Sequence, residues 1–159
     1  MLKLEGKIAV VTGGARDLGR AISLKLAAEG AKVALNYYDN PGDAEETLKI
    51  IRDGGGEAIA VQGDMTKATD VKRLFETCTS AFGHKVHILV NVVGGLVGRK
   101  LITEQDEDWY NFLMDVNMKS CWLCTREVVP LMNEGGSIVN FSSLAARDGG
   151  GPGASLYAT

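Results

Sequence analysis

Short apolar segments alternate with amphipathic segments along the whole chain. The apolar segments predict strands at Lys7–Thr12, Lys32–Tyr38, Glu57–Gln62, Val86–Asn91 and Ser137–Ser142. The segments between them repeat their apolar positions at helical spacing, and they predict helices at Asp17–Glu29, Asp43–Arg52, Lys67–Phe82 and Asp106–Asn133. Nearly continuous apolar strands are typical of strands that are buried on both faces. The alternation therefore predicts a three-layer α/β/α fold, in which helices cover both faces of a parallel sheet.

The first predicted strand leads directly into a turn that contains several glycines. This turn, Thr12–Gly19, has the sequence TGGARDLG, and the next helical pattern begins within it. Such a turn places backbone N–H groups and the positive end of a helix dipole at one spot, which suits a phosphate or pyrophosphate. Because crossovers between parallel strands are right-handed, the expected strand order is 3-2-1-4-5, with the ligand crevice at the carboxyl ends of the first and fourth strands. Residues 1–159 are thus predicted to form one Rossmann-type dinucleotide-binding domain.

Composition narrows the possible partners and compartment. The chain is 45% hydrophobic and 23% charged, and its net charge of −3 gives no electrostatic argument for nucleic acid or an anionic membrane as a partner. No apolar run approaches the roughly 20 residues that a membrane span needs. The N-terminal residues lack the apolar region of a signal peptide, and three cysteines are too few for a disulfide framework. These features favour the cytoplasm.

Cys121 and Cys124 form a C-x-x-C pair inside the long predicted helix. A zinc site of this type needs a second pair of ligands, and the sequence offers none nearby. We expect these cysteines to pack in the core or at an interface rather than to bind a metal, and we predict no metal site.

Polar residues and glycines follow each predicted strand. Parallel strands end at the same edge of a sheet, so these residues are expected to meet there. They are the residues of the glycine turn, then Asn36, Tyr37 and Tyr38, then Asp64 and Met65, then Asn91–Gly95, and finally Ser142, Ser143 and Tyr157.

The residues at these positions resemble the motifs of the classical short-chain dehydrogenase/reductase family. Thr12, Gly13 and Gly19 match the T-G-x-x-x-G-x-G turn of that family, while Asp17 replaces its middle glycine. Asp64 matches the aspartate that follows the third strand. The resemblance covers the chain from about residue 5 onward, and within the family it is greatest to 3-oxoacyl-[acyl-carrier-protein] reductases and related carbonyl reductases.

Further along the chain, Asn91 and Gly94 match two positions of the family's N-N-A-G motif. Asn117 matches its helix asparagine, Ser143 its serine, and Tyr157 the start of its Y-x-x-x-K motif. The resemblance implies an enzyme that reduces a ketone, such as a 3-oxoacyl thioester, to an alcohol by hydride transfer.

The resemblance also implies a role for each matched residue. Tyr157 would give a proton to the carbonyl oxygen, Ser143 would hydrogen-bond that oxygen, and Asn117 would position a water in the proton path. The cofactor would be bound by Gly13, Arg16, Asp17, Leu18, Gly19, Tyr37, Asp64, Met65, Asn91 and Gly94.

The end of the second strand bears on the choice of cofactor. Relatives that prefer NAD carry an acidic residue there, which binds the ribose 2′-hydroxyl. Here Tyr37 follows Asn36, and Arg16 in the glycine turn could pair with a 2′-phosphate. We therefore predict NADP rather than NAD, although Asp39 supplies an acid only two residues beyond Tyr37.

Two features depart from the family pattern. Asp17 either favours the dipole at the start of its helix or weakens cofactor binding by repelling phosphate, and we favour the first interpretation. The motif lysine falls four residues after Tyr157, beyond Thr159. We expect the chain to be the N-terminal part of a protein of about 250 residues, and residues 1–159 alone to be nearly inactive.

Two other functions remain open. The chain could be a non-catalytic dinucleotide-binding module that works through assembly with other chains, which Asp17 and the Val92–Val93 variation favour. A sugar-nucleotide epimerase uses similar tyrosine chemistry, but its glycine turn usually has a different spacing. Trp109, Met118 and Trp122 lie in the 106–133 helix at spacings that fit packing. The family resemblance implies that this helix packs against another subunit, so we expect it to form the interface of a homodimer or homotetramer.

Overall fold

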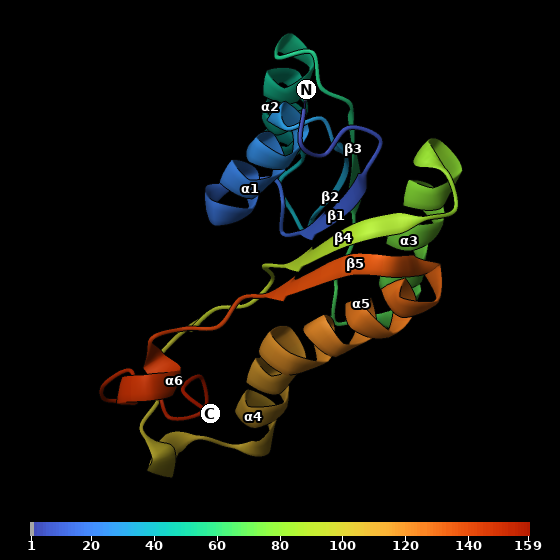
Figure 1. The fold of residues 1–159 in the computed structure, drawn as a ribbon. Coiled ribbons are helices and arrows are strands. Elements are labelled where there is room, and N and C mark those ends of the chain that lie inside the picture. Colours follow the sequence, from blue (N-terminus) through green and yellow to red (C-terminus); the bar gives the residue numbers. More distant parts are fainter. Residues whose placement is uncertain (1) are drawn as a thin grey trace.

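A computed structural model describes residues 2–159. Its strands are β1 (Ile8–Thr12), β2 (Lys32–Tyr37), β3 (Ala58–Gln62), β4 (Val86–Asn91) and β5 (Met132–Asn140). Its main helices are α1 (Asp17–Ala28), α2 (Pro41–Asp53), α3 (Ala68–Phe82), α4 (Glu107–Met114), α5 (Ser120–Val128) and the short α6 (Ala145–Asp148). All strand pairs are parallel and the order is β3-β2-β1-β4-β5, which confirms the predicted topology (Figure 1).

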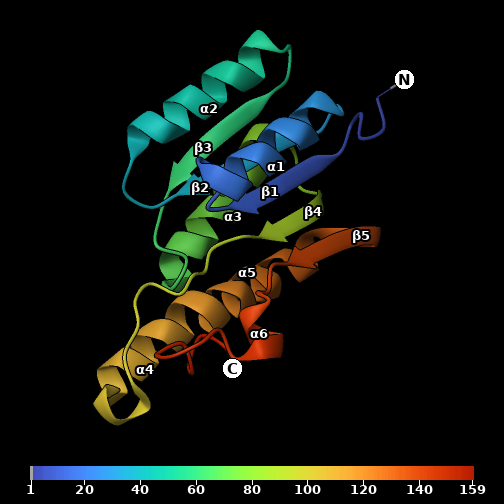
Figure 2. The ribbon, with the colours of Figure 1, turned by 90° about the vertical axis from the view of Figure 1, so that its left-hand side faces the viewer.

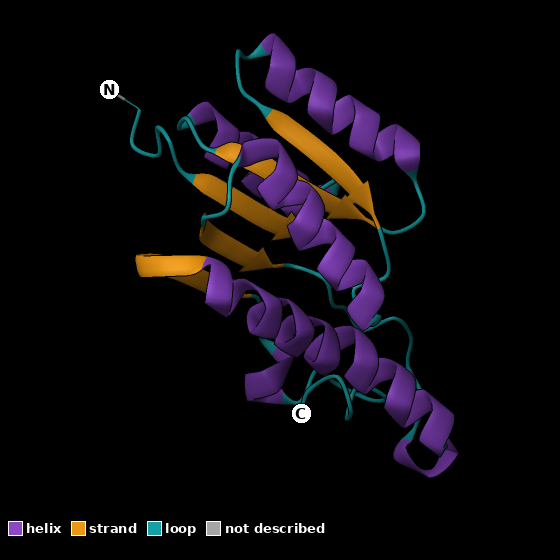
Figure 3. Cartoon of the chain, turned by 90° about the vertical axis from the view of Figure 1, so that its right-hand side faces the viewer, coloured by secondary structure: helices purple, strands orange, loops and turns teal. Residues whose placement is uncertain are grey.

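Helices cover the sheet from both sides, as Figures 2 and 3 show from opposite directions. Residues on alternate positions of a strand point to opposite faces, so each strand contributes to two cores. Val10 and Leu89 lie in the core under α3 and α5, where Leu74 and Phe75 are almost fully buried. The neighbouring positions of β1 lie in the second core, under α1 and α2. This two-sided burial explains why the strands read as unbroken apolar runs.

The long predicted helix at 106–133 is wrong as a single helix. The structure divides it into α4, a π-helical turn at Asp115–Lys119, α5 and a 3₁₀ turn at Val129–Leu131. Asn117 explains the first break, because its side-chain amide donates to the Leu113 carbonyl at 3.0 Å and so takes the place of a helical N–H. Pro130 lies in the 3₁₀ turn, since a proline lacks the N–H that would continue the helix.

The fifth strand also differs from the prediction of Ser137–Ser142. It begins at Met132, which pairs with Val86. The register is irregular between Val86 and Ile88, and the strand continues through Gly135 and Gly136. It ends at Asn140, so Ser142 and Ser143 belong to the loop before α6. Sequence patterns missed α6 and the 3₁₀ turn at Ile102–Glu104 because both are short.

Across the described residues 2–159, no helix combines the length and apolar character required to cross a membrane.

Candidate functional site

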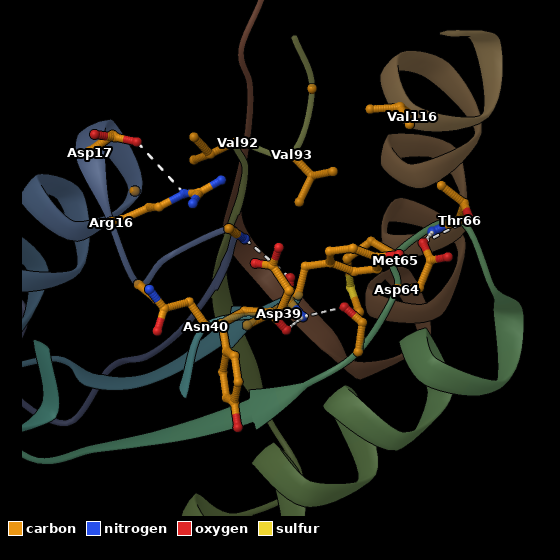
Figure 4. Close-up of a pocket in the computed structure, with 18 of the residues that line it drawn as sticks. Arg16, Asp17, Asp39, Asn40, Asp64, Met65, Thr66, Val92, Val93 and Val116 are labelled. Atoms are coloured by element: carbon orange, nitrogen blue, oxygen red, sulfur yellow. Dashed lines mark hydrogen bonds and ion pairs between the residues drawn. The ribbon is translucent and has the colours of Figure 1, made fainter. Parts of the chain in front are cut away.

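A cavity of about 770 Å³ opens at the carboxyl ends of β1 to β4 (Figure 4). Its walls come from the glycine turn, the start of α2, the turns after β3 and β4, and the junction of α4 with the π-helical turn. Of the ten residues predicted to bind a cofactor, nine line it: Gly13, Arg16, Asp17, Leu18, Gly19, Tyr37, Asp64, Met65 and Gly94.

The glycine turn brings α1 very close to the end of β1. A Cβ atom on Gly19 would lie 1.9 Å from the carbonyl oxygen of Gly13, so no other residue fits without moving backbone. Gly13 itself has a φ of +60°, in the left-handed region that glycine adopts without cost. The Ser23 hydroxyl donates to the Gly14 carbonyl at 3.0 Å and fastens the turn to the helix. The start of α1 is thus open to a ligand and its backbone is held in place.

Asp17 adopts an unusual backbone conformation, with a φ of +49°. The family has glycine at this position, and aspartate is among the few other residues that tolerate the left-handed region. Asp17 is the first residue of α1, and its side chain is 86% exposed. Its carboxylate lies 3.8 Å from the guanidinium of Arg16, which points toward the cavity in Figure 4. The acid therefore lies in the first turn, where the helix dipole favours it, and also at the rim of the cavity.

Asn36 holds three turns of the site together, although it was expected to act only through its lack of charge. Its side chain is buried, accepts from the Gly13 N–H at 3.2 Å, and donates to the carbonyls of Val61 and Gly63 at 3.3 and 3.0 Å. One amide thus joins the ends of β1, β2 and β3. This role could not be predicted from the sequence, because the pattern of apolar and polar residues does not tell a buried asparagine from an exposed one.

Thr12 performs the same task on the other side of β1. Its hydroxyl is buried and accepts from the N–H groups of Val92 and Val93, at 3.0 and 3.2 Å. This contact fixes the path of the loop that leaves β4 and forms one wall of the cavity.

The turn after β3 is held by Asp64. Its carboxylate accepts from the N–H and the hydroxyl of Thr66, at 2.9 and 2.7 Å, while its own N–H donates to Asp70 at 2.8 Å. Met65 is nearly buried, and its sulfur lies 3.9 Å from the sulfur of Cys124. Burial raises the pKa of the Cys124 thiol to about 12, so this cysteine stays protonated and packs in the core, as predicted.

Asn91 does not line the cavity. It is buried between β4, β5 and α5, and its amide donates to the Asn140 side chain at 2.9 Å. Its side-chain oxygen has no hydrogen-bond partner among the described residues. The side chain therefore acts within the sheet edge in this structure.

None of the three residues expected to act on a substrate lines the cavity. Asn117 is turned toward the loop after β4, where its oxygen accepts from the Gly95 N–H at 2.8 Å and its amide donates to the Gly95 carbonyl at 3.1 Å. Ser143 precedes α6 and is half-buried, with its oxygen accepting from the Ala145 N–H at 3.2 Å. Tyr157 is half-buried in the C-terminal segment. Figure 1 places α6 and this segment beyond the carboxyl ends of β4 and β5.

Two side chains tie the C-terminal segment to the loop before α4. Arg99 donates to the carbonyls of Gly150 and Pro152, at 2.9 and 2.8 Å, and Gln105 donates to the Ser155 hydroxyl at 3.0 Å. Both connections are exposed to solvent, and they fix the glycine-rich segment that precedes Tyr157.

Some lining residues were not predicted. They come from the start of α2 and from the helical junction at residues 112–116, namely Asn40, Asp43, Phe112, Asp115 and Val116. The second group lies in the 106–133 segment, for which the family resemblance implied a subunit interface rather than a place in the cavity wall.

The cavity, the glycine turn and the sheet order can be compared with known proteins. The family model described as short chain dehydrogenase matches residues 7–159. The chain belongs to the short-chain dehydrogenase family. An uncharacterized oxidoreductase of Methylorubrum extorquens is 40% identical over 144 residues, which are 91% of this chain and 57% of that protein. The 3-oxoacyl-[acyl-carrier-protein] reductase of Synechocystis sp. is 36% identical over 159 residues, 99% of this chain and 63% of that protein.

Solved structures of short-chain dehydrogenases share the fold. The NADH-dependent reductase A1-R′ in complex with NAD superposes with a TM-score of 0.91 at 32% identity, covering 98% of this chain and 66% of that one. The chain thus spans less than two thirds of the length of each of these three relatives. Membership in the family makes the chain part of an oxidoreductase family that uses nicotinamide dinucleotides.

Proposed function

We propose that this chain carries the cofactor site and part of the substrate site of an NADP(H)-dependent reductase that converts a ketone to an alcohol. The observation that carries the proposal is the cavity at the carboxyl edge of the sheet, where nine of the ten expected cofactor residues converge. Its size falls within the range of about 300–1,000 Å³ typical of ligand sites.

The glycine turn supports a dinucleotide as the ligand. Gly19 places no side chain between α1 and Gly13, so the start of α1 packs closely against the end of β1, and pyrophosphate binds at such helix starts. The residues present therefore fit the cofactor of the family.

The charges around the ribose end of the cavity support NADP over NAD. Tyr37 and Asn36 bring no carboxylate to the end of β2, and Arg16 points toward the cavity. Asp39, two residues beyond Tyr37, also lines the cavity, and an acid at the end of β2 favours NAD. We propose that Arg16 outweighs Asp39, because a guanidinium binds phosphate through charge-assisted hydrogen bonds.

For catalysis we propose three residues of the adjacent region. The nicotinamide, when bound, supplies a hydride to the carbonyl carbon. The Tyr157 hydroxyl gives its proton to the carbonyl oxygen. Ser143 accepts a hydrogen bond from the Ala145 N–H, which leaves its own O–H to donate to that oxygen as negative charge develops. Asn117 holds the loop at Gly95 and positions a water that returns a proton to the tyrosine.

The substrate we propose is a small ketone, and a 3-oxoacyl thioester in particular, by analogy with the Synechocystis reductase. Exposed apolar residues of α4, the π-helical turn and α5, which include Tyr110, Met118 and Trp122, support association into a dimer or tetramer through this segment. The cysteines of the described chain are free, in keeping with a cytoplasmic location.

The test is oxidation of NADPH in the presence of a 3-oxoacyl thioester. We expect residues 1–159 alone to show little or no turnover, because the family's lysine would lie four residues after Tyr157, outside this stretch. Rapid turnover by these residues would overturn that expectation. In the longest natural form, Tyr157→Phe should abolish turnover while the affinity for NADPH remains.

One observation favours a second function, a non-catalytic dinucleotide-binding module. The exposed carboxylate of Asp17 at the rim of the cavity is unusual for an enzyme that must bind pyrophosphate. If the chain is such a module, Tyr157→Phe in the longest natural form will leave its function unchanged.

A further inference from the structure

Arg20 joins two walls of the cavity from behind. Its Nε donates to the Ala15 carbonyl at 2.9 Å and to the Thr47 hydroxyl at 2.8 Å. Its terminal nitrogens reach the start of α2, where they donate to the Asp43 carbonyl at 3.2 Å and pair with the carboxylates of Asp43 and Glu46 at 3.5 and 2.8 Å. The Arg20 side chain is only 23% exposed, so these contacts are partly shielded from solvent.

Thr47 completes the joint. It is fully buried, and its hydroxyl donates to the carbonyls of Ala15 and Asp43, at 2.7 and 2.9 Å. Ala15 belongs to the glycine turn and Asp43 to the first turn of α2, and both line the cavity. The distance between the phosphate-binding turn and the start of α2 is therefore set by Arg20 together with Thr47.

The cavity lining carries more acids than bases. Its carboxylates are Asp17, Asp39, Asp43, Asp64 and Asp115, and its cations are Arg16 and Lys67. A dinucleotide is an anion, and a 2′-phosphate adds a further charge of about −1.5 to −2 at neutral pH. A carboxylate close to the phosphate groups of such a ligand weakens its binding unless a nearby cation offsets the negative charge.

Asp43 is the acid whose neutralisation depends on Arg20. One of its oxygens lies 3.5 Å from the Arg20 guanidinium, and the other accepts from the Asn40 amide at 2.9 Å. Without the guanidinium, a partly exposed and unneutralised carboxylate would remain in the wall of the cavity, which the end of β2 also lines. An acid at the end of β2 favours the 2′-hydroxyl of NAD, and a carboxylate repels a 2′-phosphate.

We propose that Arg20 is a positioning residue that makes the site selective for the 2′-phosphorylated cofactor, because it fixes α2 against the glycine turn and neutralises Asp43. This inference rests on the proposed dinucleotide site. Arg20 does not line the cavity, whereas Arg16 does, and both would contribute to the preference for NADPH.

The test compares dissociation constants for NADPH and NADH, measured by calorimetric titration of the 159-residue chain at low ionic strength. Arg20→Gln should weaken NADPH binding by about tenfold and NADH binding by about threefold or less, since the uncompensated Asp43 acts mainly on the 2′-phosphate. The control is Arg52→Gln, which removes the same charge from the exposed last turn of α2 and should change neither constant.

Two further variants separate selectivity from folding. Arg20→Gln combined with Asp43→Asn should regain most of the preference for NADPH, which a purely structural role of Arg20 would not allow. Asp43→Asn alone keeps Arg20 and should raise the preference for NADPH above that of the wild type, even if Arg20→Gln does not fold.

The outcomes distinguish the two claims. If the folded wild-type chain binds neither NADPH nor NADH, the proposed dinucleotide site is wrong and this inference falls with it. If the wild type binds NADPH but Asp43→Asn leaves the ratio of the two constants unchanged, the dinucleotide site stands and the role of Arg20 is overturned.

Discussion

The loops at the carboxyl edge of the sheet are held in two different ways. Around the glycine turn, buried side chains tie one loop to the next, as Thr12, Asn36 and Thr47 do, and each is at most 1% exposed. Around the C-terminal segment, the ties come from exposed side chains such as Arg99, and apolar residues such as Leu144 are left 66% exposed. The first region is fixed by its own core, whereas the second is fixed by a few surface contacts.

This difference separates the residues proposed to bind the cofactor from those proposed for catalysis. The residues proposed to hold the cofactor come mostly from the first region, whose buried contacts fix the cavity walls. Ser143 and Tyr157 come from the second region, where the backbone has few buried partners. We therefore expect dinucleotide binding to be robust in residues 1–159 and the proposed proton transfer to depend on further contacts.

The largest effect should come from Gly19→Ala. The new Cβ would meet the Gly13 carbonyl oxygen at 1.9 Å, so the backbone must move, and we expect a loss of more than about 3 kcal/mol in the free energy of unfolding. The matched change is Gly95→Ala in the loop after β4, where the new Cβ meets nothing within 4 Å; we expect a change within about 0.5 kcal/mol in the free energy of unfolding. Urea unfolding of both variants makes the measurement, and similar losses would show that the close approach of Gly19 to Gly13 does not limit stability.

Asn36→Asp should be nearly as damaging. A carboxylate has no N–H to offer the carbonyls of Val61 and Gly63, and as a charge it would be buried without a cation, so we expect a loss of about 3 kcal/mol. The control is Asn111→Asp, an exposed position in α4 that should change stability by less than about 0.5 kcal/mol. Thermal and urea unfolding report both, and a tolerated Asn36→Asp would mean that the three turns are held by other contacts.

Thr12→Val should have an intermediate effect. Valine has nearly the same shape, but it leaves the N–H groups of Val92 and Val93 without an acceptor, which should cost about 2 kcal/mol. Thr12→Ser keeps the hydroxyl and should retain more than half of this energy. A Thr12→Val protein as stable as the serine variant would show that the loop after β4 does not depend on this contact.

The smallest effect on global stability should come from Arg99→Ala, since exposed contacts contribute little. We expect less than about 0.5 kcal/mol in urea unfolding, together with faster amide exchange of the segment 149–155 that Arg99 holds. An unchanged rate of amide exchange in that segment would show that the C-terminal region is held by contacts other than the hydrogen bonds of Arg99.

The same contrast explains what the sequence could predict. The strands were predictable because burial on both faces restricts their residues to apolar ones, as at Val10. The glycine turn was predictable because the close approach of two backbone segments allows only glycine, as at Gly19. The break in the long helix was not predictable, because the Asn117 amide that bonds to Leu113 and causes the break is oriented by a second bond, from the Gly95 N–H of a loop 22 residues earlier. The start of β5 was missed because glycines inside a strand look like a turn.

The site shows the same limits. Sequence motifs located the residues that face the cavity, since their spacing follows the strand ends. The residues that support the site from behind, such as Arg20 and Thr47, carry no motif, because only the packed structure brings a guanidinium or a buried hydroxyl to the carbonyls that it holds.

The central claim is that the cavity beside the glycine turn binds a nicotinamide dinucleotide, with NADPH preferred. The most direct test is calorimetric titration of the 159-residue chain with NADPH and, separately, with NADH, after circular dichroism has shown that the chain is folded. We expect NADPH and NADH to bind at the same site, and NADPH to bind more tightly than NADH. A folded chain that binds neither cofactor would contradict the claim, and one that binds NADH more tightly would contradict the assigned preference.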